Sequence, residues 1–195
     1  APVAKPAVKP TFENVPYGTH ARQVLDFYQA KSGRPTPLLF FIHGGGWTAG
    51  DKSGMTGPAV KLFLDAGISV ASVNYRLLQD ANAANISPPV QWPLGDGARA
   101  VQFLRSKAGE WRLDKTRLAA TGVSAGGCTS LWLAMHDDMA EPQSSDPVAR
   151  ESTRLFGVAA KAPVVSLDPK QLREWIPNSI FSAHAFGFAE LSRAA

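Results

Sequence analysis

A five-residue run, Gly122-Val123-Ser124-Ala125-Gly126, limits what this 195-residue chain can fold into more than any other feature. It matches the pattern G-x-S-x-G, in which the serine lies on a sharp, strained turn between a strand and a helix. The flanking positions suit glycine because a side chain there would clash at so tight a turn. A short strand is expected over 117–121 and a helix from Ala125 to about His136. The run therefore predicts a turn that lifts the Ser124 hydroxyl clear of a sheet.

Strands alternate with helices along the rest of the chain, which indicates an α/β domain with a mostly parallel sheet. Two short strands around a Gly18-Thr19 turn come first, and the apolar run 38–42 is typical of a strand buried on both faces. The other expected elements are a helix over 56–66, a strand over 68–74, a loop over 82–89, a helix from Pro93 to about Lys107, a strand over 156–162 and a short helix over 167–178.

Composition and charge exclude several classes of protein. Hydrophobic residues make up 45% of the chain and charged residues 18%, which is ordinary for a globular domain. The net charge is +4, and Lys and Arg are scattered rather than striped, so nucleic acid is not an expected partner. No apolar run approaches the roughly 18 to 20 residues that a membrane span needs. The chain has no phosphate-binding loop, dinucleotide fingerprint or zinc-type histidine spacing, so neither cofactor nor metal is expected.

The first ten residues alternate Pro, Ala, Val and Lys, and we expect residues 1–10 to be a disordered lead before a domain over 11–195. Such a lead could be the tail left after a signal peptide is removed, which would imply a secreted or periplasmic protein. An arbitrary start of the chain would look the same, so the compartment stays open.

A second motif, His43-Gly44-Gly45-Gly46, follows directly after the buried strand. Glycines let the backbone approach a substrate closely, and they can point N–H groups at the oxyanion of a tetrahedral intermediate. Taken alone, the run could be a flexible glycine turn. Because the two motifs occur in the right order and each follows a strand, together they indicate a serine hydrolase with Ser124 as its nucleophile.

The chain resembles the α/β-hydrolase esterases, in particular the hormone-sensitive-lipase-like group and the related carbohydrate-esterase-like (BD-FAE-like) group. The resemblance covers roughly Val15 to Pro163 and rests on His43–Trp47, Asn74–Leu77, Pro93 with Asp96, and Gly122–Gly127. It implies the three-layer α/β-hydrolase sandwich with a mostly parallel sheet. Val123 stands where lipase-like members often have Asp, which favours the carbohydrate-esterase-like branch.

The resemblance also implies roles for single residues. Ser124 would attack an ester carbonyl and form an acyl-enzyme, and the backbone N–H groups of Gly45, Gly46 and Ala125 would form the oxyanion hole. His43 is expected to hold the glycine loop by hydrogen bonds, and Trp47 to support it. Core packing is the simpler interpretation of Trp47 and Trp92, although either could line the site for an aromatic or sugar ring. The substrate would be a small-molecule or carbohydrate ester, such as an acetyl, feruloyl or short-chain ester.

A serine hydroxyl is a poor nucleophile without a base, which should be a histidine oriented by Asp or Glu. In this fold the chain order is Ser, then acid, then His. The resemblance places the acid after the next strand and the histidine after the last one, and only one strand is expected after Ser124. We therefore expect acid and base beyond Ala195. Residues 11–195 would be the N-terminal two-thirds of a hydrolase domain, incomplete at its C-terminus, with 165–195 as a cap or excursion.

Other titratable residues have simpler interpretations. His184 is the one histidine in a suitable chain order for the base, but a loop or packing role is the simpler interpretation. His136 would lie at a helix C-terminus, where a positive charge is favoured. Asp96 could brace the active-site face, but a helix cap is the preferred interpretation. Cys128, the single cysteine, is expected to be buried and to serve packing.

Two further functions stay open at this point. A serine peptidase can share G-x-S-x-G on the same fold, although the glycine motif favours esters. The missing base also allows a non-catalytic binding protein built on a hydrolase frame. The oligomeric state is not indicated by the sequence.

Overall fold

The centre of the molecule is a six-stranded sheet, seen in a computed structural model that describes residues 8–177 and 183–187. The strands are β1 (Phe12–Pro16), β2 (Val24–Tyr28), β3 (Thr36–Ile42), β4 (Ser69–Val73), β5 (Leu113–Val123) and β6 (Gly157–Lys161). They lie in the order β1-β2-β4-β3-β5-β6. The pairs β1–β2 and β2–β4 are antiparallel, whereas β4, β3, β5 and β6 run parallel.

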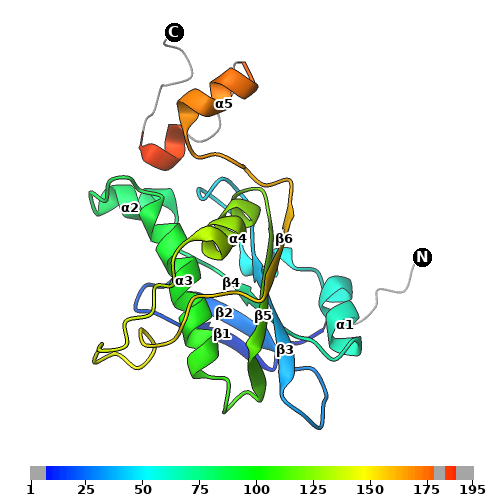
Figure 1. Ribbon diagram of the computed structural model, residues 1–195. Helices are drawn as coiled ribbons and strands as arrows, with labels where there is room; N and C mark the ends of the chain where they lie inside the picture. The colour runs from blue at the N-terminus through cyan, green and yellow to red at the C-terminus, as the bar shows by residue number, and fades with distance from the viewer. Residues whose placement is uncertain (1–7, 178–182, 188–195) are drawn as a thin grey trace, which may run out of the picture.

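Helices cover both faces of this sheet, so the molecule has three layers (Figure 1). The α-helices are α1 (Gly57–Asp65), α2 (Leu78–Ala83), α3 (Gln91–Ser106), α4 (Ala125–Met135) and α5 (Pro169–Trp175). Two short 3-10 helices are η1 (Lys52–Gly54) and η2 (Ala183–Phe186). Helix α1 lies on one face, and α3 and α4 lie on the other. The predicted mostly parallel α/β sandwich is confirmed.

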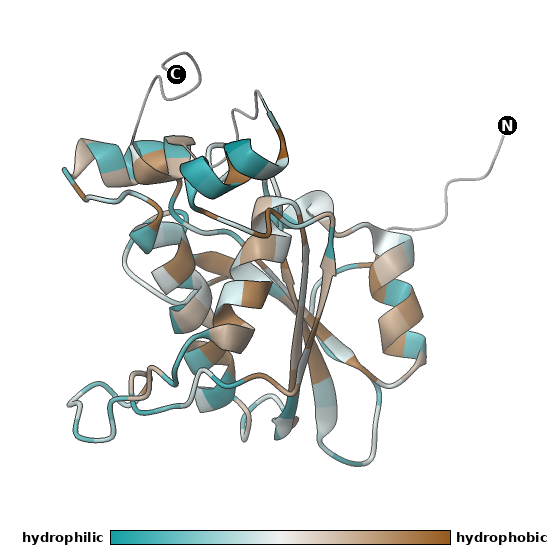
Figure 2. Ribbon diagram, turned by 45° about the horizontal axis from the view of Figure 1, so that its top comes forward, coloured by the Kyte–Doolittle hydropathy of each residue, from teal (hydrophilic) through white to brown (hydrophobic). Residues whose placement is uncertain are grey.

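The core lies on both sides of β3, as the apolar run predicts. Leu38, Phe40 and Ile42 are fully buried in the larger cluster, together with residues of α3 and α4. The intervening Leu39 and Phe41 pack against the smaller cluster beneath α1, because successive side chains of a strand point to opposite faces. Figure 2 shows the strongest hydrophobic colouring on the central strands and on the helices beside them.

Several boundaries differ from those predicted. Helix α2 covers 78–83, so the predicted loop over 82–89 begins two residues later, at 84. Helix α3 begins at Gln91, which makes Pro93 its third residue. A proline is tolerated there because the first turn has backbone N–H groups without helical partners. Strand β5 extends back to Leu113, which pairs with Thr36 of β3.

The ends of the chain are described in part. Val8, within the predicted lead over residues 1–10, packs against the cluster beneath α1, whereas residues 1–7 lie outside the described part. In the predicted excursion over 165–195, the structure describes α5, with Asp168 at its N-cap, and η2. The remaining residues of that stretch, 178–182 and 188–195, lie outside the described part.

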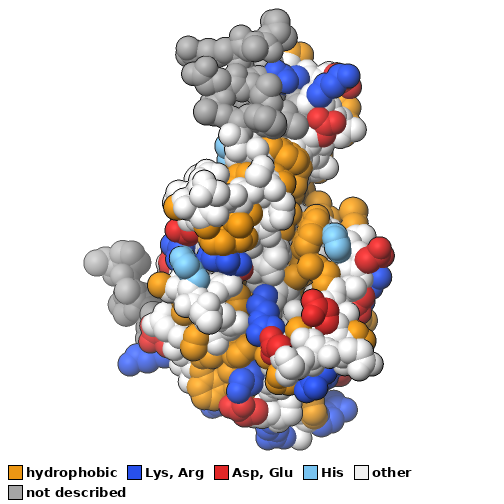
Figure 3. Space-filling model, turned by 90° about the vertical axis from the view of Figure 1, so that its left-hand side faces the viewer, with side chains coloured by type: hydrophobic (Ala, Val, Ile, Leu, Met, Phe, Trp, Pro, Cys, Tyr) orange, Lys and Arg blue, Asp and Glu red, His pale blue; other side chains and the backbone are white. Residues whose placement is uncertain are grey.

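The distribution of charge on the surface and the burial of Cys128 are as the sequence predicts. Figure 3 shows Lys and Arg interspersed with acidic and hydrophobic side chains on the face that it displays. Cys128 is 7% exposed, and burial raises the pKa of its thiol to about 11, which suits a packing role. Within the described residues, no helix has both the length and the apolar character needed to cross a bilayer.

Candidate active site

Ser124 lies between the end of β5 and the start of α4, in a backbone conformation that few residues adopt. Its φ is +53° and its ψ is −121°, and positive φ in a residue other than glycine stores strain. The turn is held on both sides. The Ser124 N–H donates to the Lys161 carbonyl at the end of β6 (3.0 Å), and the Cys128 N–H in α4 donates to the Ser124 carbonyl (2.9 Å). The strand–turn–helix context predicted from the sequence is present.

The glycines around Ser124 are required by close packing of main chain on main chain. A Cβ atom on Gly126 would lie 2.0 Å from the carbonyl oxygen of Ile42, at the end of β3. A Cβ on Gly122 would lie 2.4 Å from the carbonyl carbon of Gly126, and one on Gly44 would lie 2.7 Å from the Val123 oxygen. The serine turn therefore rests directly on the end of β3, with no room for side chains between them.

The glycine motif forms a tight loop beside this turn. Gly45, Gly46 and Trp47 all have positive φ, at +107°, +61° and +58°. The N–H groups of Thr48 and Ala49 donate to the Gly45 carbonyl, at 3.0 and 3.1 Å, which closes the loop on itself. Within the part of the chain that the structure describes, the N–H groups of Gly45, Gly46 and Ala125 have no acceptor. Backbone N–H groups without an acceptor can donate to an anion that binds beside them.

The side chains of His43 and Trp47 hold this loop in place. The His43 ring is buried against the Tyr75 ring, with centroids 4.2 Å apart, and its Nδ1–H donates to the Gly44 carbonyl (2.7 Å). Burial lowers the pKa of His43, which favours the neutral ring. Trp47 is 1% exposed and its Nε1–H donates to the Thr129 hydroxyl on α4 (3.0 Å). Trp47 is thus a core residue whose indole links the loop to α4.

A pocket of about 320 Å³ opens where these elements meet, at the carboxyl ends of β3 and β5. In open α/β sheets, this end of the strands is where ligands bind. The residues that line the pocket are Gly46, Trp47, Thr48, Ser124, Ala125, Val164 and His184. The predicted site residues that this pocket brings together are Gly46, Trp47, Ser124, Ala125 and His184, whereas Gly45 and His43 are not part of its lining.

The four histidines lie at different places relative to the pocket and to Ser124. His184 lies in η2, and its Nε2 is 3.0 Å from the Gly46 carbonyl oxygen, beside the pocket. His20 is half-buried in the turn before β2, where its Nδ1 accepts from the Arg22 N–H. His136 is exposed at the C-cap of α4. Within the described residues, the Ser124 hydroxyl has no hydrogen-bond partner, and none of these histidines is bonded to it.

Asp96 has a different role from the helix cap that the sequence predicts, and that prediction is wrong. Asp96 lies in the second turn of α3, not at its start, and is 1% exposed. Its carboxylate accepts from the Arg76 guanidinium (2.5 Å), from the Arg76 backbone N–H (2.8 Å) and from the Gln23 amide (2.8 Å). The Arg76 guanidinium also lies 3.9 Å from the Trp92 ring centroid. Asp96 thereby ties the segment after β4 to α3. The family resemblance singled out the Asn74–Leu77 run, but no pattern in the sequence indicated that Arg76 binds Asp96.

We expect Asp96→Asn to lower the free energy of unfolding by about 3 to 5 kcal/mol, because it leaves the Arg76 charge without its buried partner. Urea denaturation followed by circular dichroism measures this loss. Asp65→Asn is the matched control, since the Asp65 side chain is 61% exposed and its pair with Lys61 is a surface pair, worth less than about 1 kcal/mol. Equal losses in the two variants would contradict the structural role of Asp96.

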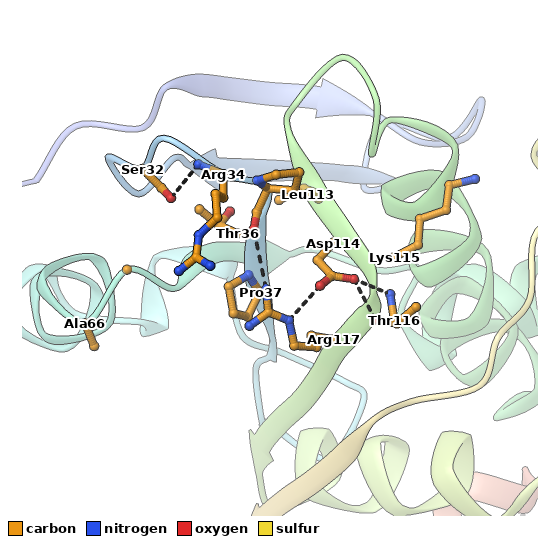
Figure 4. A pocket seen from close by; sticks show the side chains of 12 residues that line it. Ser32, Arg34, Thr36, Pro37, Ala66, Leu113, Asp114, Lys115, Thr116 and Arg117 are labelled. Carbon is orange, nitrogen blue, oxygen red and sulfur yellow. Dashed lines mark hydrogen bonds and ion pairs between the residues drawn. The ribbon is translucent and has the colours of Figure 1, made fainter.

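A larger cavity lies elsewhere. It measures about 710 Å³ and lies at the amino ends of β3 and β5, the opposite end of the strands from Ser124 (Figure 4). Its charged residues are largely compensated: Arg117 pairs with Asp114, and Lys115 pairs with Glu151 outside the lining. Because the strands separate this cavity from the serine turn, it is not part of the candidate active site.

The strand order, the serine turn after β5 and the glycine loop after β3 are together those of the α/β-hydrolase class. Within this class, the BD-FAE family model matches residues 25–172. The match covers most of the chain, and this protein belongs to the BD-FAE family.

Individual relatives agree with this placement. The chain is 30% identical over 128 residues to the probable carboxylic ester hydrolase LipM of Mycobacterium tuberculosis, covering 63% of this chain and 28% of LipM. It is 31% identical over 154 residues to gut esterase 1 of Caenorhabditis elegans, covering 77% of this chain and 27% of that protein. The chain thus spans less than a third of the length of these two relatives.

A solved structure shows the same fold. The crystal structure of the acetyl ester-xyloside bifunctional hydrolase from Caldicellulosiruptor lactoaceticus superposes with a TM-score of 0.64 at 28% sequence identity. The superposition covers 74% of this chain and 50% of that one. The α/β-hydrolase fold expected from the sequence is confirmed.

Proposed function

We propose that this protein hydrolyses carboxylic esters through an acyl-enzyme formed on Ser124. One observation carries the proposal: Ser124, on its strained turn, lines the same small pocket as the main chain of Gly46 and Ala125. A nucleophile and free N–H donors in one pocket are what acyl transfer requires. The names of the relatives, which are esterases and an ester hydrolase, support ester cleavage rather than peptide cleavage.

In the proposed reaction, the Ser124 oxygen forms a bond to the ester carbonyl carbon, and the serine proton passes to a general base. The carbonyl oxygen becomes an oxyanion, stabilised by the N–H groups of Gly45, Gly46 and Ala125 and by the positive end of the α4 dipole. The alcohol then leaves with a proton, and water cleaves the acyl-enzyme to release the acid. We assign the general base to a histidine other than the four of this sequence, since none of them is bonded to Ser124.

We further propose a short acyl group, such as acetyl, carried by a carbohydrate or another small alcohol. The pocket volume of about 320 Å³ and its partly apolar lining by Trp47 and Val164 suit a small acyl group. The structural relative is named for an acetyl ester-xyloside activity, which supports a carbohydrate ester.

The proposal is tested on the complete gene product with a fluorophosphonate probe and three substrates. We expect the probe to modify the peptide that contains Ser124, as read by mass spectrometry. We also expect turnover of p-nitrophenyl acetate and of acetylated xylo-oligosaccharides, but not of a peptide anilide. Absence of labelling would favour the binding-protein alternative, and faster turnover of the anilide would favour the peptidase.

A further inference from the structure

A segment far along the chain contacts the glycine loop. Helix η2 begins 137 residues after Gly46, yet its His184 places Nε2 at 3.0 Å from the Gly46 carbonyl oxygen. The His184 ring centroid also lies 6.2 Å from the centroid of Trp47. The segment is anchored by the Val90 N–H, which donates to the Ala185 carbonyl (3.1 Å), and Ala185 is fully buried. Figure 1 shows η2 in red, close to α2.

The donor and the acceptor of this hydrogen bond can be assigned. A carbonyl oxygen only accepts hydrogen bonds, so the Nε2 of His184 must carry the hydrogen and donate it. Nε2–H is also present in the protonated ring, so the contact is compatible with both charge states. An Nε2 that donates to a carbonyl has no lone pair free to take the serine proton. In this arrangement, the Nε2 of His184 is bonded to the glycine loop and not to Ser124.

The contact falls on a glycine of the loop. Gly46 has φ of +61° and no side chain, so its peptide planes would rotate easily if nothing held them. The Trp47 indole ties the loop to α4, and the His184 ring binds the Gly46 carbonyl. The Gly46 N–H, a donor of the proposed oxyanion hole, lies in the preceding peptide plane, whose Gly45 carbonyl accepts from Thr48 and Ala49. The two planes meet at the Gly46 Cα, so both must be held to fix the direction of the N–H.

We propose that His184 is a positioning residue, whose bond to the Gly46 carbonyl keeps the Gly46 N–H directed at the oxyanion. The inference rests on the proposed function, because the oxyanion arises in that reaction. The oxyanion forms in the transition state rather than in the bound substrate. Loss of this alignment therefore lowers kcat and leaves KM nearly unchanged.

The test compares His184→Leu, which keeps the bulk and removes the donor, with His184→Gln, whose side-chain N–H can replace Nε2–H. With p-nitrophenyl acetate and the complete protein, we expect His184→Leu to lower kcat roughly tenfold, between the loss of one ordinary hydrogen bond and the loss of an oxyanion donor. We expect KM to change less than about twofold, and His184→Gln to recover most of kcat. Phe186→Leu, on the same short helix, is the control and should keep wild-type kcat.

Hydrogen–deuterium exchange of the peptide that covers 43–50 gives a second readout that does not need activity. We expect faster exchange in His184→Leu and wild-type exchange in His184→Gln. If His184→Leu fails to fold, His184→Asn replaces it, because the shorter amide cannot reach the Gly46 oxygen. Unchanged kcat and unchanged exchange in the donor-free variant would overturn the inference, as would a loss that glutamine does not restore. If the wild-type protein is neither labelled nor active, the proposed function fails, and the exchange data alone decide whether His184 holds the loop.

Discussion

Replacing Ser124 with alanine is expected to abolish fluorophosphonate labelling and to lower kcat/KM for p-nitrophenyl acetate by at least roughly 10³-fold. The expected loss is large because no acyl-enzyme can form without the serine oxygen. The oxyanion donors of the main chain stay in place, so only the residual rate that they provide should remain. Steady-state assays at saturating and limiting substrate measure kcat and kcat/KM.

Ser106→Ala is the control for this variant. Ser106 ends α3 and its hydroxyl donates to the Phe103 carbonyl, away from the pocket. The control should keep wild-type labelling and kcat/KM. Labelling that persists in Ser124→Ala would show that another residue is the nucleophile and would contradict the proposed function.

The second large effect concerns folding rather than chemistry. In an ordinary helix, glycine to alanine stabilises by about 1 kcal/mol. At Gly126 the sign should reverse, because the added Cβ would lie 2.0 Å from the Ile42 oxygen and 2.6 Å from the His43 oxygen. Both atoms belong to the main chain and cannot turn aside. We therefore expect Gly126→Ala to destabilise the protein by at least about 3 kcal/mol or to prevent folding.

Gly95→Ala supplies the matched comparison for Gly126→Ala. Gly95 also lies in a helix, α3, but a Cβ there would meet no atom within 4 Å. This variant should be more stable than wild type by about 0.5 to 1 kcal/mol. Urea denaturation of the two variants measures the difference. A Gly126→Ala variant as stable as Gly95→Ala would show that the serine turn does not pack directly on β3.

The sequence predicted those parts of the site whose chemistry is local. The Ser124 turn and the glycine loop each follow a run of residues that is typical of a strand. Each also contains glycines, which are needed where two main chains pack closely together, and both features are present as expected. The buried strand over 38–42 could also be predicted, because a short apolar run between turn residues is typical of a strand buried on both faces.

The parts that escaped prediction depend on contacts between distant segments. Asp96 pairs with Arg76 and Gln23, at separations of 20 and 73 residues, and no local pattern encodes such a pair. The contact of His184 with Gly46 spans 138 residues. After the buried Leu113, residues 114–117 of β5 are polar and largely exposed, so the sequence has no apolar pattern there. The pairing of Leu113 with Thr36 of β3 marks this beginning of the strand.

The contact of Gly126 with the end of β3 has a practical consequence for protein engineering. The proposed nucleophile and the glycine loop meet through main-chain atoms, so their mutual alignment does not depend on which side chains fill the pocket. Directed evolution can therefore vary Val164, a half-buried side chain that lines the pocket, to change acyl selectivity. Such libraries should yield altered specificity at nearly unchanged fold, whereas libraries that include Gly122 or Gly126 should yield mostly unfolded proteins.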